Sequence, residues 1–329
     1  MDYVHLSNGD IKVSKYALGC WALSGNMTWG NQKFDDSVKA VKKAFSLGIN
    51  FFDTAEVYGD GGSEEVLGRV IKDFREDIIL ASKVARDNLK PEDVKNSCEK
   101  SLQRLNTDYL DIYYIHWPNP QIPISETLGA IEDLKREGKI RAIGCSNFGK
   151  NDLVEVLGFA DIIANQLPYN LLWRAIEYEI KPVCLDKNID IIAYSPLAQG
   201  LLTGKYKRPA EVPEGRARTR HFSRERPKAR HNEEGFEKET FDTIDKIREI
   251  SREAGVDMIH LALNWILEQK GVSNVIVGAR TPAQIEENVK ALKVEISEDI
   301  FDKLDQVTTD LKNKLGKNPD FWQTDSRFN

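Results

Sequence analysis

Eight strand-like runs, each followed by a segment of helical periodicity, constrain the fold of this chain more than any other feature. The runs begin near Tyr16, Asn50, Ile78, Tyr109, Ile140, Ile162, Ile189 and Asn274. The helical segments return the chain, so we expect successive strands to run parallel. A closed barrel of eight such units needs about 250 residues, and the chain has 329. The pattern predicts an α/β fold, a (β/α)8 TIM barrel, with residues 1–329 forming a single domain.

A doubly wound sheet also alternates strands and helices. Such a sheet normally carries GxGxxG after its first strand, and here the first strand-like run leads into LGCWALSGN at 18–26, which does not fit. Eight regular units therefore favour the closed barrel.

Three segments depart from the eight-fold repeat. Residues 3–13 alternate around Asn8-Gly9, a dipeptide suited to a type I′ turn, which predicts an N-terminal β-hairpin able to plug the bottom of a barrel. A long loop from Gln199 to about Asn232 and extra helical stretches at 235–254 and 257–269 separate the seventh and eighth strands. A helix capped by Thr281, another starting near Ser297 and an irregular tail from Lys314 complete the chain.

Composition narrows the class of protein. Lys and Arg number 46 against 52 Asp and Glu, a net charge of −6, which disfavours nucleic-acid binding. No apolar run is long enough to span a bilayer, and no signal peptide is evident. Four widely spaced cysteines suggest neither a zinc site nor disulfides. We expect a cytoplasmic protein, a monomer or a weak homo-oligomer.

Charged and polar residues stand at the ends of three successive strand-like runs. Asp53 ends the second run, Lys83 the third and His116 the fourth, and Tyr58 lies on the loop after Asp53. The carboxyl ends of parallel strands share one edge, which is where barrel enzymes keep their chemistry. Alone, each residue is more often a cap or a packing residue. Together they place an acid, a base, an imidazole and a phenol in one site.

This order of residues resembles the active-site tetrad of the aldo-keto reductases, and the resemblance extends along nearly the whole chain. It implies a reductase that transfers hydride from a nicotinamide cofactor, NADP(H), to an aldehyde or ketone. Tyr58 would donate the proton, Lys83 held by Asp53 would lower the pKa of Tyr58, and His116 would orient the carbonyl. No metal is required.

The same resemblance indicates the cofactor site. Ser146, Asn147 and Gln166 would hold the carboxamide, with Tyr194 stacked under the ring. The remaining cofactor residues are Trp21, then Ser195, Leu197, Gln199, Gly200, Lys205 and Arg216 along the pyrophosphate, and Gly278, Arg280, Gln284, Glu287 and Asn288 around the adenosine.

One departure concerns the adenosine motif. Well-known members of the family begin it with Lys-Ser and have Arg where Gln284 stands, whereas this chain resembles the bacterial stress-protein branch and the potassium-channel β-subunits. Preference for NADPH then depends mainly on Arg280.

Aromatic residues predict the substrate end. Trp21, Trp29 and Trp117 are expected to contact the substrate, with Tyr169 and Trp173 also at the pocket mouth. Polar neighbours Asp60, Asn26 and Asn119 favour a small polar or sugar-derived carbonyl.

Two other functions fit parts of the sequence. A regulatory sensor subunit, like the channel β-subunits, would keep the same tetrad, but no inactivation segment is evident before the hairpin that begins at residue 3, which disfavours the channel role. A barrel lyase or isomerase would leave residues 278–288 unexplained.

Residues 205–230, termed the basic loop, hold ten Lys and Arg against three acids. The loop is either a solvated, disordered segment or a clasp over the cofactor pyrophosphate, with spare arginines for an acidic substrate.

Overall fold

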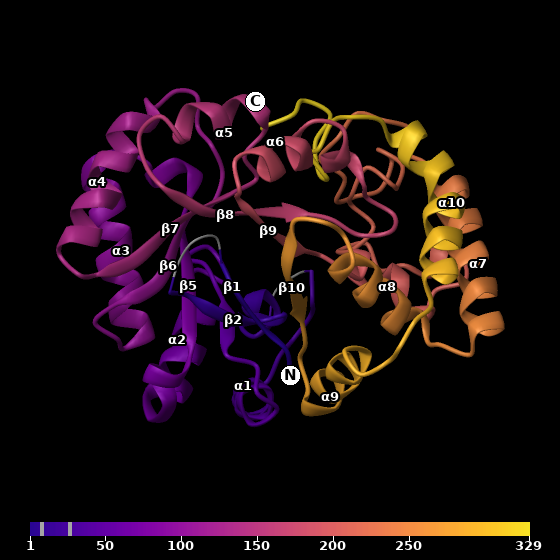
Figure 1. The fold of residues 1–329 in the computed structure, drawn as a ribbon, viewed down its shortest axis with the longest axis horizontal. Helices are drawn as coiled ribbons and strands as arrows, with labels where there is room; N and C mark the ends of the chain where they lie inside the picture. Colours follow the sequence, from indigo (N-terminus) through magenta and orange to yellow (C-terminus); the bar gives the residue numbers. More distant parts are fainter. Residues whose placement is uncertain (7–9, 26–27) are drawn as a thin grey trace.

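A closed parallel barrel forms the centre of the molecule (Figure 1). The structure, a computed structural model, describes residues 1–6, 10–25 and 28–329. The barrel follows chain order and closes by pairing β10 with β3, so the predicted TIM barrel is confirmed. Its strands are β3 (Tyr16–Gly19), β4 (Phe51–Asp53), β5 (Ile79–Val84), β6 (Leu110–Ile115), β7 (Ile140–Ser146), β8 (Ile162–Pro168), β9 (Asp190–Tyr194) and β10 (Val272–Gly278).

Helices surround the barrel, with α2, α3 and α4 on one side and α7, α8 and α10 on the other (Figure 1). Helix α2 continues as a 3-10 segment, η2 (Ile71–Asp77), that is broken at Phe74. The α-helices are α1 (Phe34–Ser46), α2 (Gly62–Val70), α3 (Pro91–Leu105), α4 (Ile124–Arg136), α5 (Lys150–Val156), α6 (Ile180–Asp186), α7 (Glu237–Ala254), α8 (Met258–Leu267), α9 (Pro282–Ala291) and α10 (Glu298–Leu315).

The predicted N-terminal hairpin is present as β1 (Tyr3–His5) paired antiparallel with β2 (Lys12–Ser14). The proposed turn at Asn8-Gly9 lies outside the described residues. Leu6, Ile11 and Val13 belong to the same buried cluster as the side chains inside the barrel. The hairpin therefore closes one end of the barrel, and the opposite end is left for a site.

The alternation of side chains along each strand decides which residues enter the barrel. On β6, Ile112 and Tyr114 join the interior cluster, whereas Tyr113 and Ile115 pack against the helices. Because alternate residues share a face, continuing the series places His116 on the interior side. The same count from Phe51 and Ala81, both interior, turns Asp53 and Lys83 inward.

The long insertion and the tail lie at the carboxyl ends of the strands. After β9 come two short 3-10 segments, η5 (Ala198–Thr203) and η6 (Pro209–Glu211), and then helices α7 and α8, as predicted. Beyond α10 the chain crosses to α5 (Figure 1), where the carbonyl of Asn329 accepts from the amides of Asn151 at 2.8 Å and Asp152 at 3.2 Å.

No helix in the described part of the chain is long and apolar enough to cross a membrane. The four cysteines, Cys20, Cys98, Cys145 and Cys184, are buried and free.

Candidate active site

A buried ion pair forms the floor of the site. Asp53 ends β4 and lies opposite Ala81 on β5, so Lys83, two residues further on, faces the same side. The Lys83 ammonium donates to Asp53 Oδ1 at 2.6 Å and to the Thr54 carbonyl at 2.7 Å. Asp53 Oδ2 accepts from Gln166 Nε2 at 2.8 Å. Burial lowers the pKa of Lys83, and the Asp53 carboxylate opposes that shift.

Tyr58 folds back over this pair. A tight turn brings the Tyr58 amide to the Ala55 carbonyl at 3.0 Å, and the turn is completed by Gly59 and Gly61, both at positive φ. The phenol oxygen accepts a hydrogen bond from the Lys83 ammonium at 3.4 Å.

The pKa of Tyr58 differs from the sequence-based expectation. Burial raises this pKa well above 10, and the Asp53 carboxylate raises it further. We expected Lys83 to lower it. The lysine charge is offset by Asp53 at 2.6 Å, and the phenol is partly buried, which disfavours the phenolate. Tyr58 is therefore a protonated phenol in this structure, with a proton available to donate.

His116 follows the end of β6 beside Tyr58, with the two ring centroids 5.8 Å apart. Burial lowers the pKa of His116 well below 6.5, and the positive charges of Lys83 and Arg327 lower it further. The imidazole is therefore neutral near pH 7 and can donate one N–H.

Side chains at the ends of β7, β8 and β9 form a connected polar group. Tyr194 donates through its hydroxyl to Asn147 Oδ1 at 2.8 Å. Asn147 Nδ2 donates to Ser146 Oγ and to the His116 carbonyl, both at 3.0 Å. Ser146 Oγ donates to the Gln166 carbonyl at 3.1 Å. This network joins the predicted nicotinamide residues to the catalytic floor.

A cavity of about 890 Å³ lies above the floor. Except for Lys83, which is buried beneath it, every residue predicted for catalysis or for the cofactor lines this cavity, and so do the three tryptophans predicted to contact the substrate. They are Trp21, Trp29, Asp53, Tyr58, His116, Trp117, Ser146, Asn147, Gln166, Tyr194, Ser195, Leu197, Gln199, Gly200, Lys205, Arg216, Gly278, Arg280, Gln284, Glu287 and Asn288.

The loop after β9 has a strained backbone. Ser195, Ala198 and Gln199 have left-handed φ angles of 53°, 45° and 55°, uncommon outside glycine. Both polar atoms of the Gln199 amide are buried without a partner among the described residues. A Cβ on Gly200 would lie 3.0 Å from the Lys205 ammonium nitrogen and 3.9 Å from Arg216 Nη1. The loop thus forms a cradle with two cations and an unused amide.

Arg280, at the other end of the cavity, is already engaged. Its guanidinium donates to the Trp29 carbonyl at 2.6 Å, to Gln32 Oε1 at 2.8 Å and to the Asn31 carbonyl. Its backbone amide donates to Gln284 Oε1 at 2.8 Å. Arg280 therefore ties the loop after β3 to the end of β10, besides lining the cavity.

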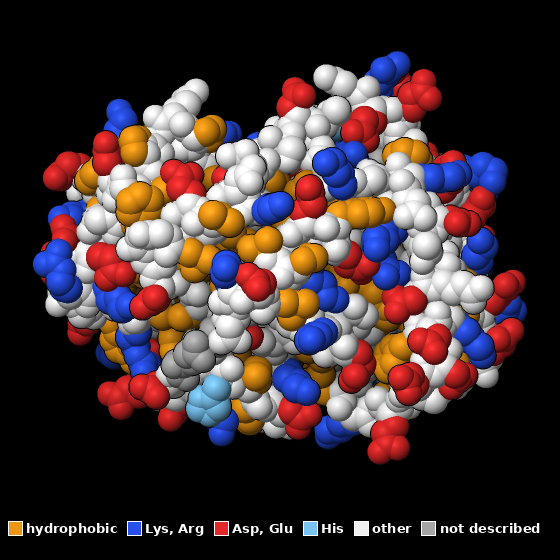
Figure 2. Space-filling model, turned by 45° about the horizontal axis from the view of Figure 1, so that its top comes forward, with side chains coloured by type: hydrophobic (Ala, Val, Ile, Leu, Met, Phe, Trp, Pro, Cys, Tyr) orange, Lys and Arg blue, Asp and Glu red, His pale blue; other side chains and the backbone are white. Residues whose placement is uncertain are grey.

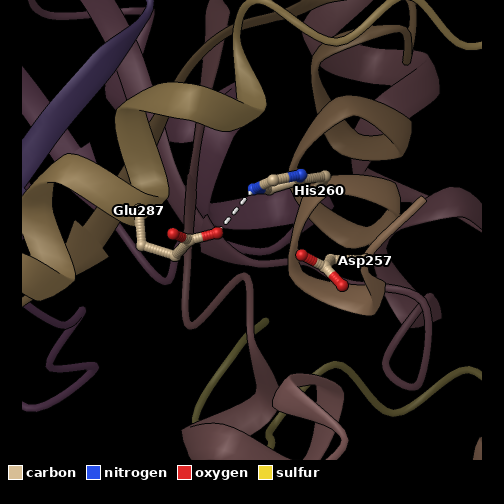
Figure 3. Close-up of side chains that lie close together, drawn as sticks. All are labelled: Asp257, His260 and Glu287. Carbon is tan, nitrogen blue, oxygen red and sulfur yellow. Dashed lines mark hydrogen bonds and ion pairs between the residues drawn. The ribbon is translucent and has the colours of Figure 1, made fainter.

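Asp257, His260 and Glu287 point toward one another from α8 and α9 (Figure 3). Their ligand atoms lie within 4.8 Å of one another, and the residue types suit zinc. However, Glu287 accepts from His260 Nε2 at 3.0 Å, and its second oxygen pairs with the Lys290 ammonium at 3.0 Å. A metal ion would have to break both contacts, so we interpret the cluster as a charge-balanced support for Glu287 at the cavity wall.

Several sequence-based assignments at the pocket mouth are wrong. Tyr169 is buried outside the cavity and donates to Glu177 Oε1 at 2.7 Å, and Trp173 is buried against Phe321. Asp60 and Asn119 also do not line the cavity. Asn26 lies outside the described residues. After β8 the chain turns away from the cavity, and Tyr169 and Trp173 are buried. A position just after a strand therefore does not by itself predict that a residue lines the cavity.

The sequence analysis did not assign several other residues that line the cavity. They are Gly19, Cys20, Ala22, Val57, Pro196, Thr203, Arg218, Arg230, Ile259, Ile276, Val277, Trp322 and Arg327. Arg327 stacks on Trp117, with its guanidinium carbon 3.5 Å from the ring centroid, and pairs with Asp320 at 2.7 Å. In the tail, the aromatic pair Phe321-Trp322 indicates a segment that packs on the barrel, but not that Trp322 reaches this cavity.

The chain belongs to the aldo/keto reductase family, because the sequence model of that family matches residues 15–309. Members are nicotinamide-dependent oxidoreductases that act on carbonyl groups.

Three curated relatives illustrate the range of the family. The aldo-keto reductase YhdN of Bacillus subtilis is 35% identical, covering 87% of each chain. An NADH-specific methylglyoxal reductase of Escherichia coli is 34% identical, covering 91% of this chain and 95% of that protein. A probable voltage-gated potassium channel subunit beta of Arabidopsis thaliana is 32% identical, covering 93% and 96%.

Two solved structures show the same architecture. The glycerol dehydrogenase of Gluconobacter oxydans has 30% identity and a TM-score of 0.80, with 97% of each chain covered. An aldo-keto reductase of Klebsiella pneumoniae in complex with NADPH has 29% identity and a TM-score of 0.73, covering 93% of this chain and 94% of that one.

The cradle after β9 fits the phosphates of a nicotinamide dinucleotide. Lys205 and Arg216 offer positive charge, Gly200 leaves room for close approach, and the buried Gln199 amide has hydrogen-bonding capacity that the described residues do not use.

Proposed function

We propose that this protein reduces an aldehyde or ketone to the alcohol with NADPH, and that Tyr58 donates the proton. The observation that carries this proposal is the contact of the Tyr58 hydroxyl with the Lys83 ammonium, 3.4 Å apart, at the floor of a cavity lined by a neutral His116. A bound nicotinamide supplies the hydride that no side chain can supply.

Each floor residue has a separate task in this proposal. The Tyr58 hydroxyl gives its proton to the carbonyl oxygen, and the His116 N–H donates a hydrogen bond to the same oxygen and orients it. As the phenol loses its proton, the Lys83 ammonium stabilises the developing phenolate. Asp53 keeps Lys83 charged despite burial.

The residues that line the cavity would hold the cofactor in three groups. Ser146, Asn147, Gln166, Tyr194 and Trp21 would bind the nicotinamide. Ser195, Leu197, Gln199, Gly200, Lys205 and Arg216 would bind the pyrophosphate. Gly278, Arg280, Gln284, Glu287 and Asn288 would bind the adenosine.

Replacing Tyr58 by Phe tests the proton donor. Tyr58→Phe keeps the ring stacked on Trp21 but removes the hydroxyl, so we expect turnover to fall by about a hundredfold or more. NADPH binding, followed by fluorescence titration, should stay unchanged. Near-normal turnover in this variant would exclude Tyr58 as the donor.

A substitution of Arg280 tests whether the protein prefers NADPH to NADH. The relatives leave this preference open, because one of them is NADH-specific. Arg280→Ala should weaken NADPH more than NADH, since a 2′-phosphate is the group that a guanidinium binds best. The variant also frees the loop held through Trp29 and Asn31, so some loss is expected for both cofactors. Equal losses would assign Arg280 to the loop alone.

The substrate is a small carbonyl compound in this proposal. Two of the three polar residues that favoured a sugar lie outside the cavity, so the sugar assignment loses its basis.

A sensor subunit is the second candidate because of the similarity to the plant channel-subunit protein. Fast turnover against a panel of carbonyl compounds favours the reductase, and slow turnover with tight NADPH binding favours the sensor.

A further inference from the structure

Arg218 is a cation that lines the cavity and has no counter-ion among the described residues. It lies on the basic loop between two tryptophan rings, with its guanidinium carbon 5.5 Å from the centroid of Trp21 and 4.7 Å from that of Trp322. Its Nε is buried and has no hydrogen-bond partner in the described part of the chain. Aromatic faces hold a guanidinium in place but do not neutralise it.

Other arginines of the basic loop are neutralised. Arg208 pairs with Glu211, Arg220 with Glu233, Arg224 with Glu225, and Arg226 with both Glu214 and Glu237. Of the acidic residues among the described cavity-lining residues, Asp53 is bound to Lys83 and Glu287 to His260. Neither is free to pair with Arg218.

Burial at this position is costly for a charge. Burial lowers the pKa of Arg218 to about 10, and the neighbouring Arg230 contributes to the shift. The guanidinium therefore still carries its charge near pH 7, partly removed from water and beside a second cation. An anion entering the cavity would relieve both costs.

The contact with Trp21 shows that Arg218 lies at the end of the cavity that holds Tyr58, where the substrate carbonyl would bind. The Trp21 ring stacks on Tyr58, with centroids 5.9 Å apart, and its neighbour Trp29 meets it edge to face at 5.4 Å. Arg216, two residues before Arg218, lies instead over Trp29 at 5.2 Å and donates to the Tyr206 hydroxyl at 2.9 Å, next to the phosphate cradle. The two arginines thus serve different ends of one cavity.

The balance of charge supports this division. Cations lining the cavity are Lys205, Arg216, Arg218, Arg230, Arg280 and Arg327. Lys205, Arg216 and Arg280 lie near the proposed cofactor phosphates, and Arg327 is paired with Asp320. Arg218 and Arg230 remain. Figure 2 shows Lys and Arg side chains gathered near the middle of the forward face, among hydrophobic ones.

We propose that Arg218 binds an oxyanion, a carboxylate or a phosphate, on the carbonyl substrate, with Arg230 adding positive charge at the rim. Trp21 and Trp322 fix the plane of the guanidinium so that its N–H groups face the anion. This inference rests on the proposed reductase function and names the substrate class of the same site.

Matched substrate pairs test the inference. We compare kcat/KM for succinic semialdehyde with that for its methyl ester, and for glyceraldehyde phosphate with that for glyceraldehyde, at saturating NADPH. A charged hydrogen-bonded contact predicts a preference of about tenfold to a hundredfold for one anionic member. Arg218→Met, which keeps the apolar stem between the two rings, should abolish that preference by lowering kcat/KM for the anionic member far more than for the neutral one.

Arg226→Gln is the matched control, because Arg226 lies on the same loop but pairs with Glu214 and Glu237 outside the cavity. It should keep the preference. A wild-type enzyme that reduces charged and neutral members equally would overturn the inference and leave the reductase function standing. An Arg218→Met variant that weakens NADPH but keeps the preference would assign Arg218 to the cofactor and also overturn it.

A binding measurement gives a readout independent of turnover. Succinate and inorganic phosphate are titrated into the complex with NADP, and tryptophan fluorescence is followed because Arg218 touches Trp21 and Trp322. Binding of either anion to the wild type and loss in Arg218→Met supports the inference and identifies the preferred anion, even if no carbonyl is reduced. Binding of neither, or equal binding to the variant, overturns it.

Discussion

The positions of single residues at the strand ends explain how the charged and polar side chains of the candidate site come together. Asp53, Lys83 and His116 were predicted to meet because the carboxyl ends of parallel strands share one edge, and the structure places them around one cavity floor. Their electrostatics could not be predicted in the same way. The raised pKa of Tyr58 depends on burial and on the 2.6 Å pairing of Lys83 with Asp53.

His221 makes stability depend on pH. It is fully buried between Trp173 and Phe321, and its Nε2 contacts the Leu172 carbonyl at 2.9 Å. Burial lowers the pKa of His221 to about 4 from 6.5, and the charges of Arg220 and His231 also lower it.

As pH falls below 6.5, the unfolded chain binds a proton at His221 that the folded protein does not bind until about pH 4. Stability is therefore lost across this interval, by up to about 3 kcal/mol. In urea unfolding at about pH 7 and about pH 4.5, His221→Gln should show a smaller loss than the wild type, and the exposed His5→Gln should match the wild type. Identical pH dependence in both variants would contradict the assignment.

At the scale of elements, buried charges join neighbouring strands. Asp111 on β6 accepts from the Leu80 amide on β5 at 2.9 Å and pairs with Arg75 of η2 at 2.9 Å and Arg141 of β7 at 2.7 Å. This one carboxylate holds three adjacent elements together. The sequence alone did not indicate this structural role of Asp111, because its partners Leu80, Arg75 and Arg141 lie on other elements.

Asp111→Asn should therefore destabilise the fold strongly. Removing the charge leaves Arg75, only 11% exposed at its side chain, without its carboxylate. We expect the free energy of unfolding to fall by roughly 3 kcal/mol. The exposed pair of Asp133 with Lys95 provides the control, and Asp133→Asn should cost much less than Asp111→Asn because water screens an exposed ion pair. Similar losses for the two variants would show that burial of the Asp111 cluster adds nothing.

At the scale of the whole molecule, the order of strands and helices was predictable and the cover of the cavity was not. Regular periods identified all the barrel strands, and the predicted start of the last one, Asn274, lies within two residues of Val272. Loops have no period, so pairing of the basic loop with Glu233 and Glu237, and the approach of Trp322 from the tail, could not be read from the sequence. Because Trp173 also lies on a loop, the same lack of a period explains why it was wrongly predicted to line the pocket mouth.

Two segments distant in sequence meet over the cofactor part of the cavity. Trp29, on the loop after β3, stacks with Arg216 of the basic loop at 5.2 Å, and Arg280 holds the first loop to the end of β10. We expect a bound NADPH, whose phosphates lie on Lys205 and Arg216, to join all three segments from inside.

NADPH should therefore protect the basic loop from trypsin, which can cut after exposed residues such as Lys207, Arg224 and Lys228. Cofactor affinity should also fall as salt rises, because several charges act at once on the phosphates. Limited digestion with and without NADPH, followed by mass spectrometry, measures the first effect, and titration at increasing ionic strength measures the second. The double variant Lys205→Gln, Arg216→Gln should lose both. Equal cleavage rates with and without NADPH in the wild type would mean that the loop does not close on the cofactor, and the meeting of Trp29 with Arg216 would then be a packing contact alone.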